Sequence, residues 1–151
     1  MKRTAPLVAI IGLFLFSLGR IAQAGEYKNV EVTKVITSTT ASNGDPLTYL
    51  RAEHPEVTAL VVRIFPGQST GWHKHPVPVY AYVLEGTLTV ELKEGKKYSF
   101  KKGDAILEVM NTLHNGYNGG NEPVSLVVFY TGAVGTPNVI KEEVPSASVQ
   151  R

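Results

Sequence analysis

Three histidines have the residue type and the spacing of metal ligands. His73 and His75 are separated by one residue, and His114 follows later in the chain. Alternate side chains of a β-strand point to the same face, so His73 and His75 should point in one direction. For this pair alone, coincidence or two surface histidines are the alternatives. A third imidazole favours one metal site formed by His73, His75 and His114, which leaves coordination positions open.

The segments around these histidines have the pattern of short strands. Residues 87–92 alternate apolar and polar side chains, whereas residues 57–65 and 124–130 are mostly apolar. Glycine-containing turns separate these runs, and many short strands are typical of an all-β sandwich or barrel. In a small antiparallel β-barrel, hairpin-connected strands return to face the first strand. His114 can then reach His73 and His75.

The chain is predicted to contain four segments. Residues 1–24 have a basic start, an apolar run and small residues before Gly25, which is the pattern of a secretory signal peptide. A membrane anchor is the alternative, but the apolar run is shorter than the roughly 20 residues of a spanning helix. Residues 25–56 are expected to form an N-terminal strand, over 27–36, and a loop. Residues 57–131 form the barrel core, and 132–151 an extension that is partly irregular.

Charge and cysteine content restrict the classes of function. Removing Lys2, Arg3 and Arg20 with the signal peptide would change the formal net charge from +2 to −1. This balance, with no basic patch, argues against a nucleic-acid partner. After signal removal no membrane association is expected, and the protein would be exported, either periplasmic or secreted. The absence of cysteine excludes thiol nucleophiles and cysteine-ligated metal centres.

Two motifs in the sequence resemble those of the cupins, a superfamily of small β-barrels. The first cupin motif is matched by Gly67, His73, His75 and Gly86 at the family spacing. The second motif is matched by Gly103, His114 and Asn118. The resemblance covers residues 57–130 and implies a double-stranded β-helix, a jelly-roll-like fold with metal ligands in its interior.

The sequence departs from the cupin pattern at three motif positions. The glutamate that is normally the fourth protein ligand of the metal is replaced by Val79, which cannot bind a metal ion. Glu85 lies close by, but it precedes the closing glycine and should belong to the turn. Val109 and Asn111 replace the proline and glycine of the second motif. A three-histidine site with an additional open position is therefore expected.

The resemblance implies a metal-dependent function without naming the substrate. The cofactor would be one divalent ion of iron, manganese, zinc, nickel or copper. Some cupins with three histidines are iron dioxygenases, whereas others are isomerases, lyases or binding proteins. An oxygenase or lyase that acts on a small molecule is the first hypothesis, and a non-catalytic module that binds metal or a small ligand is the second. No catalytic residue is assigned from the sequence.

An aromatic stripe suggests self-association. On one strand Val79, Ala81 and Val83 should point inward, so that Tyr80, Tyr82 and Leu84 point outward. An outer face this apolar favours a partner, and we expect a homodimer. Packing beneath the N-terminal segment is the alternative.

The remaining polar and aromatic residues near the motifs are given structural roles. His54 is expected to be exposed, and Trp72 to face away from the site. Glu108 and Tyr117 are interpreted as structural residues that could approach the pocket. Asn118 should support a strand end through hydrogen bonds.

Overall fold

The computed structural model describes residues 29–142, which contain strands and turns but no helix. The chain divides into two units at Thr33, and every described strand belongs to the second unit, which begins at Lys34. The strands are β1 (Pro55–Ile64), β2 (His73–Lys74), β3 (Val79–Glu85), β4 (Thr87–Leu92), β5 (Lys97–Lys101), β6 (Ala105–Leu107), β7 (His114–Tyr117), β8 (Val124–Ala133) and β9 (Ile140–Lys141). No described segment forms a helix of the length and hydropathy that a membrane crossing requires.

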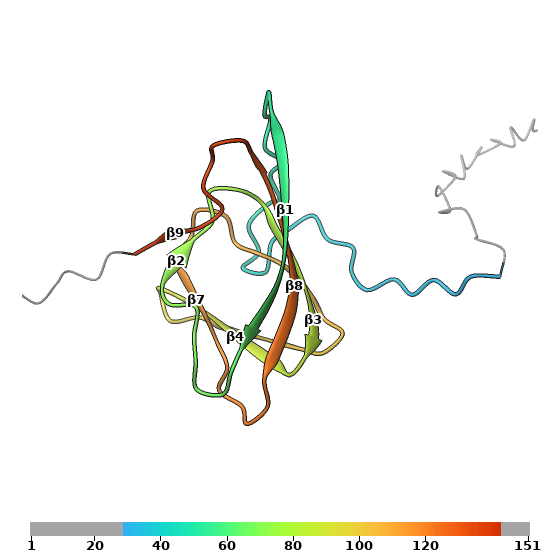
Figure 1. Cartoon of the computed structure of the whole chain (residues 1–151), viewed down its shortest axis with the longest axis vertical. Helices are drawn as coiled ribbons and strands as arrows, with labels where there is room; N and C mark the ends of the chain where they lie inside the picture. Colours follow the sequence, from blue (N-terminus) through green and yellow to red (C-terminus); the bar gives the residue numbers. More distant parts are fainter. Residues whose placement is uncertain (1–28, 143–151) are drawn as a thin grey trace, which may run out of the picture. The chain divides into compact units, whose positions relative to one another are not determined.

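The strands form two antiparallel sheets, as the all-β prediction requires (Figure 1). One sheet has the order β1-β8-β3-β6 and the other has the order β5-β4-β7-β2-β9. Within the described residues no ladder joins the sheets into a closed barrel, so the arrangement is jelly-roll-like.

The core lies between the inward faces of the two sheets. Along β3 the side chains of Val79, Ala81 and Val83 are buried, whereas Tyr82 and Leu84 are exposed. This alternation confirms the predicted inward and outward faces of the strand. Each fully buried valine or leucine contributes about 1.5–3 kcal/mol, so the core can stabilise a fold that has no disulfide.

The two ends of the described chain differ in how far they form strands. Residues 29–36, the described part of the expected strand 27–36, form no strand, and Val30, Val32, Val35 and Ile36 are exposed. Within its described part, the segment from residue 132 contains the end of β8, up to Ala133, and the two-residue β9, which pairs with β2.

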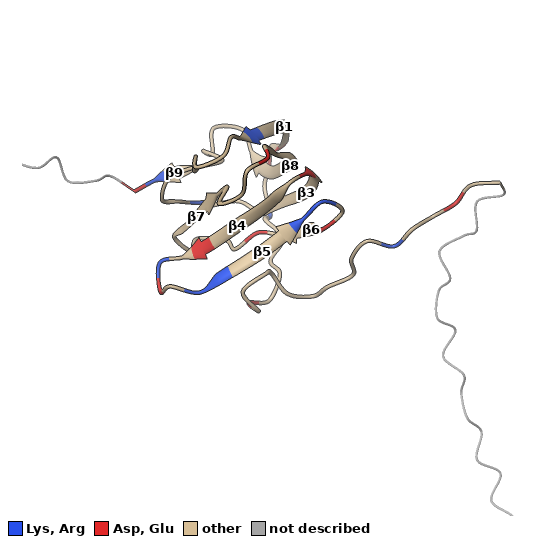
Figure 2. Cartoon of the chain, turned by 90° about the horizontal axis from the view of Figure 1, so that it is seen from below, with Lys and Arg blue, Asp and Glu red and all other residues tan. Residues whose placement is uncertain are grey.

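The lysines near the turns are exposed. At the β4–β5 turn, Lys97 lies 3.4 Å from Glu91 and Lys93 lies 2.9 Å from Glu142. Figure 2 shows both signs of charge around this turn. Exposed pairs of this kind typically contribute less than about 1 kcal/mol.

Candidate metal site

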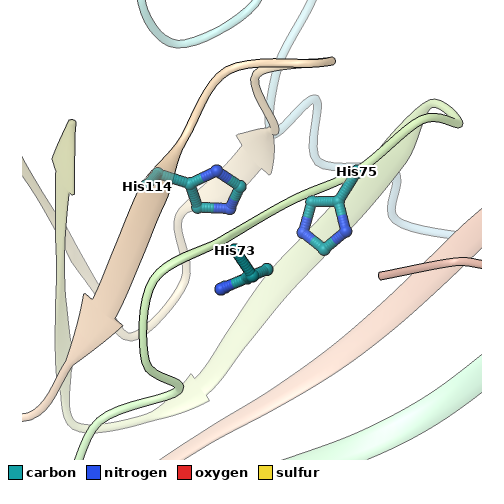
Figure 3. A group of neighbouring side chains, drawn as sticks. All are labelled: His73, His75 and His114. Carbon is teal, nitrogen blue, oxygen red and sulfur yellow. The ribbon is translucent and has the colours of Figure 1, made fainter. Parts of the chain in front are cut away.

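The three histidines predicted to act together lie together in the structure. His73 is paired with His114 across β2 and β7, and His75 forms an isolated bridge with Met110. The ring centroids are 4.4–5.0 Å apart, and one ligand atom from each ring lies within 4.8 Å of the others. Figure 3 shows the rings gathered around a common space. The side chains are 2–7% exposed.

Backbone carbonyls determine the orientation of each imidazole. Nδ1 of His73 donates to the carbonyl of Gly71 at 2.8 Å, and Nδ1 of His114 donates to that of Thr112 at 2.9 Å. Nδ1 of His75 donates to the carbonyl of Asn138 at 2.8 Å. A carbonyl can only accept, so each proton sits on Nδ1 and each Nε2 keeps its lone pair. This is the arrangement of metal-ligating histidines, and the three residues fit a divalent ion.

Burial keeps the imidazoles neutral. It lowers the pKa of His73 and His114, and it lowers the pKa of His75 to about 4. The carbonyl hydrogen bonds act in the opposite direction but are outweighed. A metal ligand must be unprotonated, so the site is ready for a cation at neutral pH.

Glu108 lies in the site, although the sequence interpretation gave it a structural role and expected no carboxylate there. Its Oε2 is 3.9 Å from Nε2 of His114, and its side chain is 13% exposed. Burial raises the pKa of this carboxyl to about 7. A weak signal was available, because strand alternation continued one residue past β6 would place Glu108 on the face of the buried Ile106.

The histidines and Glu108 line a cavity of about 60 Å³ between the sheets. The rest of the wall is mostly apolar, with Val79, Ala81, Leu88, Val90, Leu126 and Val128 among its members. Tyr130, which the sequence analysis missed, also lines it and packs edge-on against His75 at 5.5 Å between centroids. The volume is close to that of two waters, at roughly 30 Å³ each.

A second pocket, the outer pocket, shares Val79 and Glu108 with the histidine cavity. Its volume is about 190 Å³, and it is lined by these two residues, by Pro78, Tyr80 and Met110, and by residues 41 and 45–48. Val79 and Glu108 therefore form a wall common to this outer pocket and the histidine cavity.

The other residues that the sequence analysis named lie away from the cavity. His54 is exposed, and the ring of Trp72 packs under Lys93 Nζ at 5.2 Å. Tyr117 packs against Lys97 and does not line the cavity. Asn118 has the predicted supporting role, because its amide donates to the carbonyls of Ile64 and Glu122 at 2.9 and 2.8 Å.

The motif departures have local explanations. Asn111 adopts φ +56°, a left-handed conformation that asparagine tolerates better than most residues, so it can stand where the motif has glycine. Gly86 has φ +73°, and a Cβ there would lie 2.6 Å from the carbonyl oxygen of Pro123. The closing glycine of the first motif is therefore required by backbone crowding.

Comparison with known families and structures agrees with this architecture. The family model described as "Cupin domain" matches residues 60–130. The polyketide cyclase RemF from Streptomyces resistomycificus is 22% identical with a TM-score of 0.51, and the match covers 60% of this chain and 63% of that one. For a chain from the structures of the DMSP lyases RdDddP and RnDddQII the identity is 20%, the TM-score 0.50 and the coverage 58% and 44%.

A third similar structure is the oxalate decarboxylase of Lactobacillus farciminis in its formate complex. It is 22% identical with a TM-score of 0.49, and the match covers 56% of this chain and 26% of that one. The present chain thus spans between 26% and 63% of the length of these three solved chains. None of the curated proteins matches the sequence. Identities this low show a shared fold and leave the reaction open.

Proposed function

Residues 60–130 belong to the cupin superfamily, and on this premise we propose that His73, His75 and His114 bind one divalent metal ion. The protein would be an exported metal-dependent enzyme, an oxygenase or lyase that acts on a small molecule. The hydrogen bonds from the three Nδ1 atoms to backbone carbonyls carry this proposal. They leave three Nε2 lone pairs directed at one space, and neutral nitrogen ligands suit iron, manganese, zinc, nickel or copper.

The chain's own residues would prepare the site for a small ligand. The metal, when bound, would polarise a ligand or activate oxygen. The apolar wall of Val79, Leu88 and Val128 excludes water and lowers the local dielectric, which strengthens polar interactions at the centre. The lyase alternative also has the analogy of the DMSP lyases, which rests on fold alone.

Cavity size favours a second candidate function, a non-catalytic metal-binding module. A volume of about 60 Å³ is well below the roughly 300–1,000 Å³ of pockets that enclose a drug-sized ligand. An enzyme with this cavity must act on a molecule of few atoms, or on one end of a larger molecule. A binding module needs no such substrate.

Metal analysis of two variants tests the metal site. His114→Ala should lose most of the metal bound by the wild type, because one of three protein ligands is removed. His54→Ala removes an exposed histidine and should keep the metal. Elemental analysis after purification gives the result, and full metal content in His114→Ala would overturn the proposed site.

Turnover assays separate the two functions. The wild type loaded in turn with each of the five metals would be incubated with small carboxylates, enols and thiols. Oxygen uptake or product formation that His114→Ala lacks supports the enzyme. Tight metal binding without turnover in any form supports the binding module.

Export and dimerisation complete the proposal. The signal-peptide pattern of residues 1–24, which lie outside the described residues, supports export, and N-terminal sequencing of the exported protein should begin at Gly25. The outer face of the β1-β8-β3-β6 sheet supports a homodimer. Val61, Val127 and Tyr82 form one row across three strands of this sheet, and Val61 is 68% exposed.

A further inference from the structure

A carboxylate stands beside the position at which the cupin motif lacks one. The amide of Glu108 donates to the carbonyl of Val79 at 3.0 Å, so the two residues are neighbours on adjacent chain segments. Both line the cavity that contains the three histidines. We propose that Glu108 is a fourth protein ligand of the metal and takes the place of the carboxylate missing at position 79. This inference rests on the proposed three-histidine metal site.

When Glu108 is ionised, its contact with His114 is one between two electron-pair donors. Nδ1 of His114 carries the proton, because it donates to the carbonyl of Thr112, and Nε2 therefore offers a lone pair. Oε2 of Glu108 lies 3.9 Å from that nitrogen. Two ligands that each lie about 2.0–2.2 Å from one ion are roughly 3–4 Å apart, so the separation fits a shared cation.

The charge balance of the cavity also supports metal binding by Glu108. The side chain of Glu108 is largely buried, and among the residues that the structure describes no lysine or arginine lines the cavity. A buried carboxylate without a cation is costly, and in folded proteins such a group is paired or bound to a metal. A divalent ion held by the histidines would supply the missing positive charge. The carboxylate must move toward His73 and His75 to complete the set, since the group of mutually close ligand atoms contains the histidines alone.

Glu108 lines the outer pocket as well as the histidine cavity, as Val79 on β3 does. Asp45 lines only that pocket and not the histidine cavity. Asp45→Asn therefore removes one nearby negative charge without removing a candidate ligand. It is a control for the loss of a carboxylate charge from the outer pocket, at an exposed position.

The experiment measures metal affinity by competition with a chelator, using Co²⁺ and Zn²⁺ on the folded, full-length mature protein. Glu108→Gln preserves shape and should weaken binding at least tenfold and change the visible spectrum of bound Co²⁺. Asp45→Asn should bind within about threefold of wild type. The double variant Val79→Glu/Glu108→Val, which moves the carboxylate to the motif position, should recover most of the affinity.

The outcomes separate this inference from the proposed function. Wild-type affinity and an unchanged Co²⁺ spectrum in Glu108→Gln, with metal lost from His114→Ala, would overturn the fourth ligand and leave the three-histidine site intact. Equal losses in Glu108→Gln and Asp45→Asn would show a general charge effect and also overturn it. A double variant that binds as weakly as Glu108→Gln would overturn the equivalence with position 79. Metal retained by His114→Ala would reject the site itself. Circular dichroism of the metal-free variants checks that they fold.

Discussion

His73 and His114 lie directly opposite each other, and theirs is the one residue pair in the β2–β7 register. Strand β2 has only two residues, so its attachment to β7 depends on a short contact. A metal ion held by both imidazoles would add a link across the same pair. Metal binding should therefore stabilise the fold as well as prepare the site.

We expect metal to raise the thermal unfolding temperature of the wild type. At a free metal concentration one hundred times Kd, the gain in the free energy of unfolding is about 2.7 kcal/mol. For a chain of this length, this corresponds to a rise of roughly 5–10 °C. Calorimetry with and without metal measures it. His114→Ala should show almost no rise, and an equal rise in that variant would contradict the link.

The metal-free protein should show opposing effects of pH on its stability. His75 has a folded pKa near 4, below its ordinary value, so its contribution is present above pH 6.5 and is lost as pH falls toward 4. The carboxyl of Glu108 has a folded pKa near 7, above its ordinary value. Its stabilising contribution to the free energy of unfolding is present below pH 4.5 and is lost as pH rises through 7.

Glu108→Gln isolates the histidine contribution to this pH dependence. Without metal, the free energy of unfolding of this variant should fall by on the order of 3 kcal/mol between pH 6.5 and pH 4. The cause is that His75 binds a proton more readily in the unfolded state than in the folded state. Urea unfolding in the presence of a chelator gives the free energies. The double variant His75→Gln/Glu108→Gln should show a flatter dependence, and an equally steep one would assign the loss to other groups.

Gly86→Ala should destabilise the protein by about 3 kcal/mol. The φ of +73° costs an L-residue about 1–2 kcal/mol, and the new Cβ would lie 2.6 Å from the carbonyl oxygen of Pro123. Gly95→Ala is the control, because Gly95 also has positive φ but an alanine Cβ there would have no heavy atom within 4 Å beyond its chain neighbours. Urea unfolding should show a loss of only about 1 kcal/mol there. Equal losses would mean that crowding at Pro123 is unimportant.

The outer sheet face should form a homodimer interface. Light scattering of the wild type at micromolar concentration should give twice the monomer mass. Val61→Asp places a charge at the exposed β1 end of this row and should give a monomer, since burying an unpaired carboxylate is costly. Val134→Asp is equally exposed but follows the end of β8, and it should remain dimeric. A monomeric wild type would contradict the prediction.

The parts of the fold that the sequence predicted are those governed by local periodicity. The predicted strand 124–130 corresponds to β8, and alternation along β3 correctly assigned the buried and exposed faces. The two motifs also brought His73, His75 and His114 together correctly, because their spacing implies strand pairing. The strand expected over residues 27–36 is absent from its described part, residues 29–36, whose apolar side chains are exposed.

Contacts that depend on non-local register could not be predicted. The closeness of Glu108 to His114 follows from the pairing of β3 with β6, together with the hydrogen bond from Glu108 to Val79. The carbonyl of Asn138, which accepts a hydrogen bond from His75, is a second example. The side-chain type of residue 138 does not predict that its backbone carbonyl meets His75. Sequence patterns describe which face a side chain occupies but not which distant backbone group it meets.

Because His75 donates a hydrogen bond to the carbonyl of Asn138, the end of the described chain forms part of the proposed metal site. Residues 138–142 are held at this edge by that bond, by the β2–β9 pair and by the amide of Glu142, which donates to the carbonyl of Trp72 at 2.9 Å. A protein shortened before residue 138 would keep all three histidines and still lose control of the tautomer of one. Conversely, metal bound to the three histidines should protect residues 138–142 from proteases and slow their amide hydrogen exchange. Protease resistance and exchange rates of this segment would then measure metal binding without a probe in the cavity.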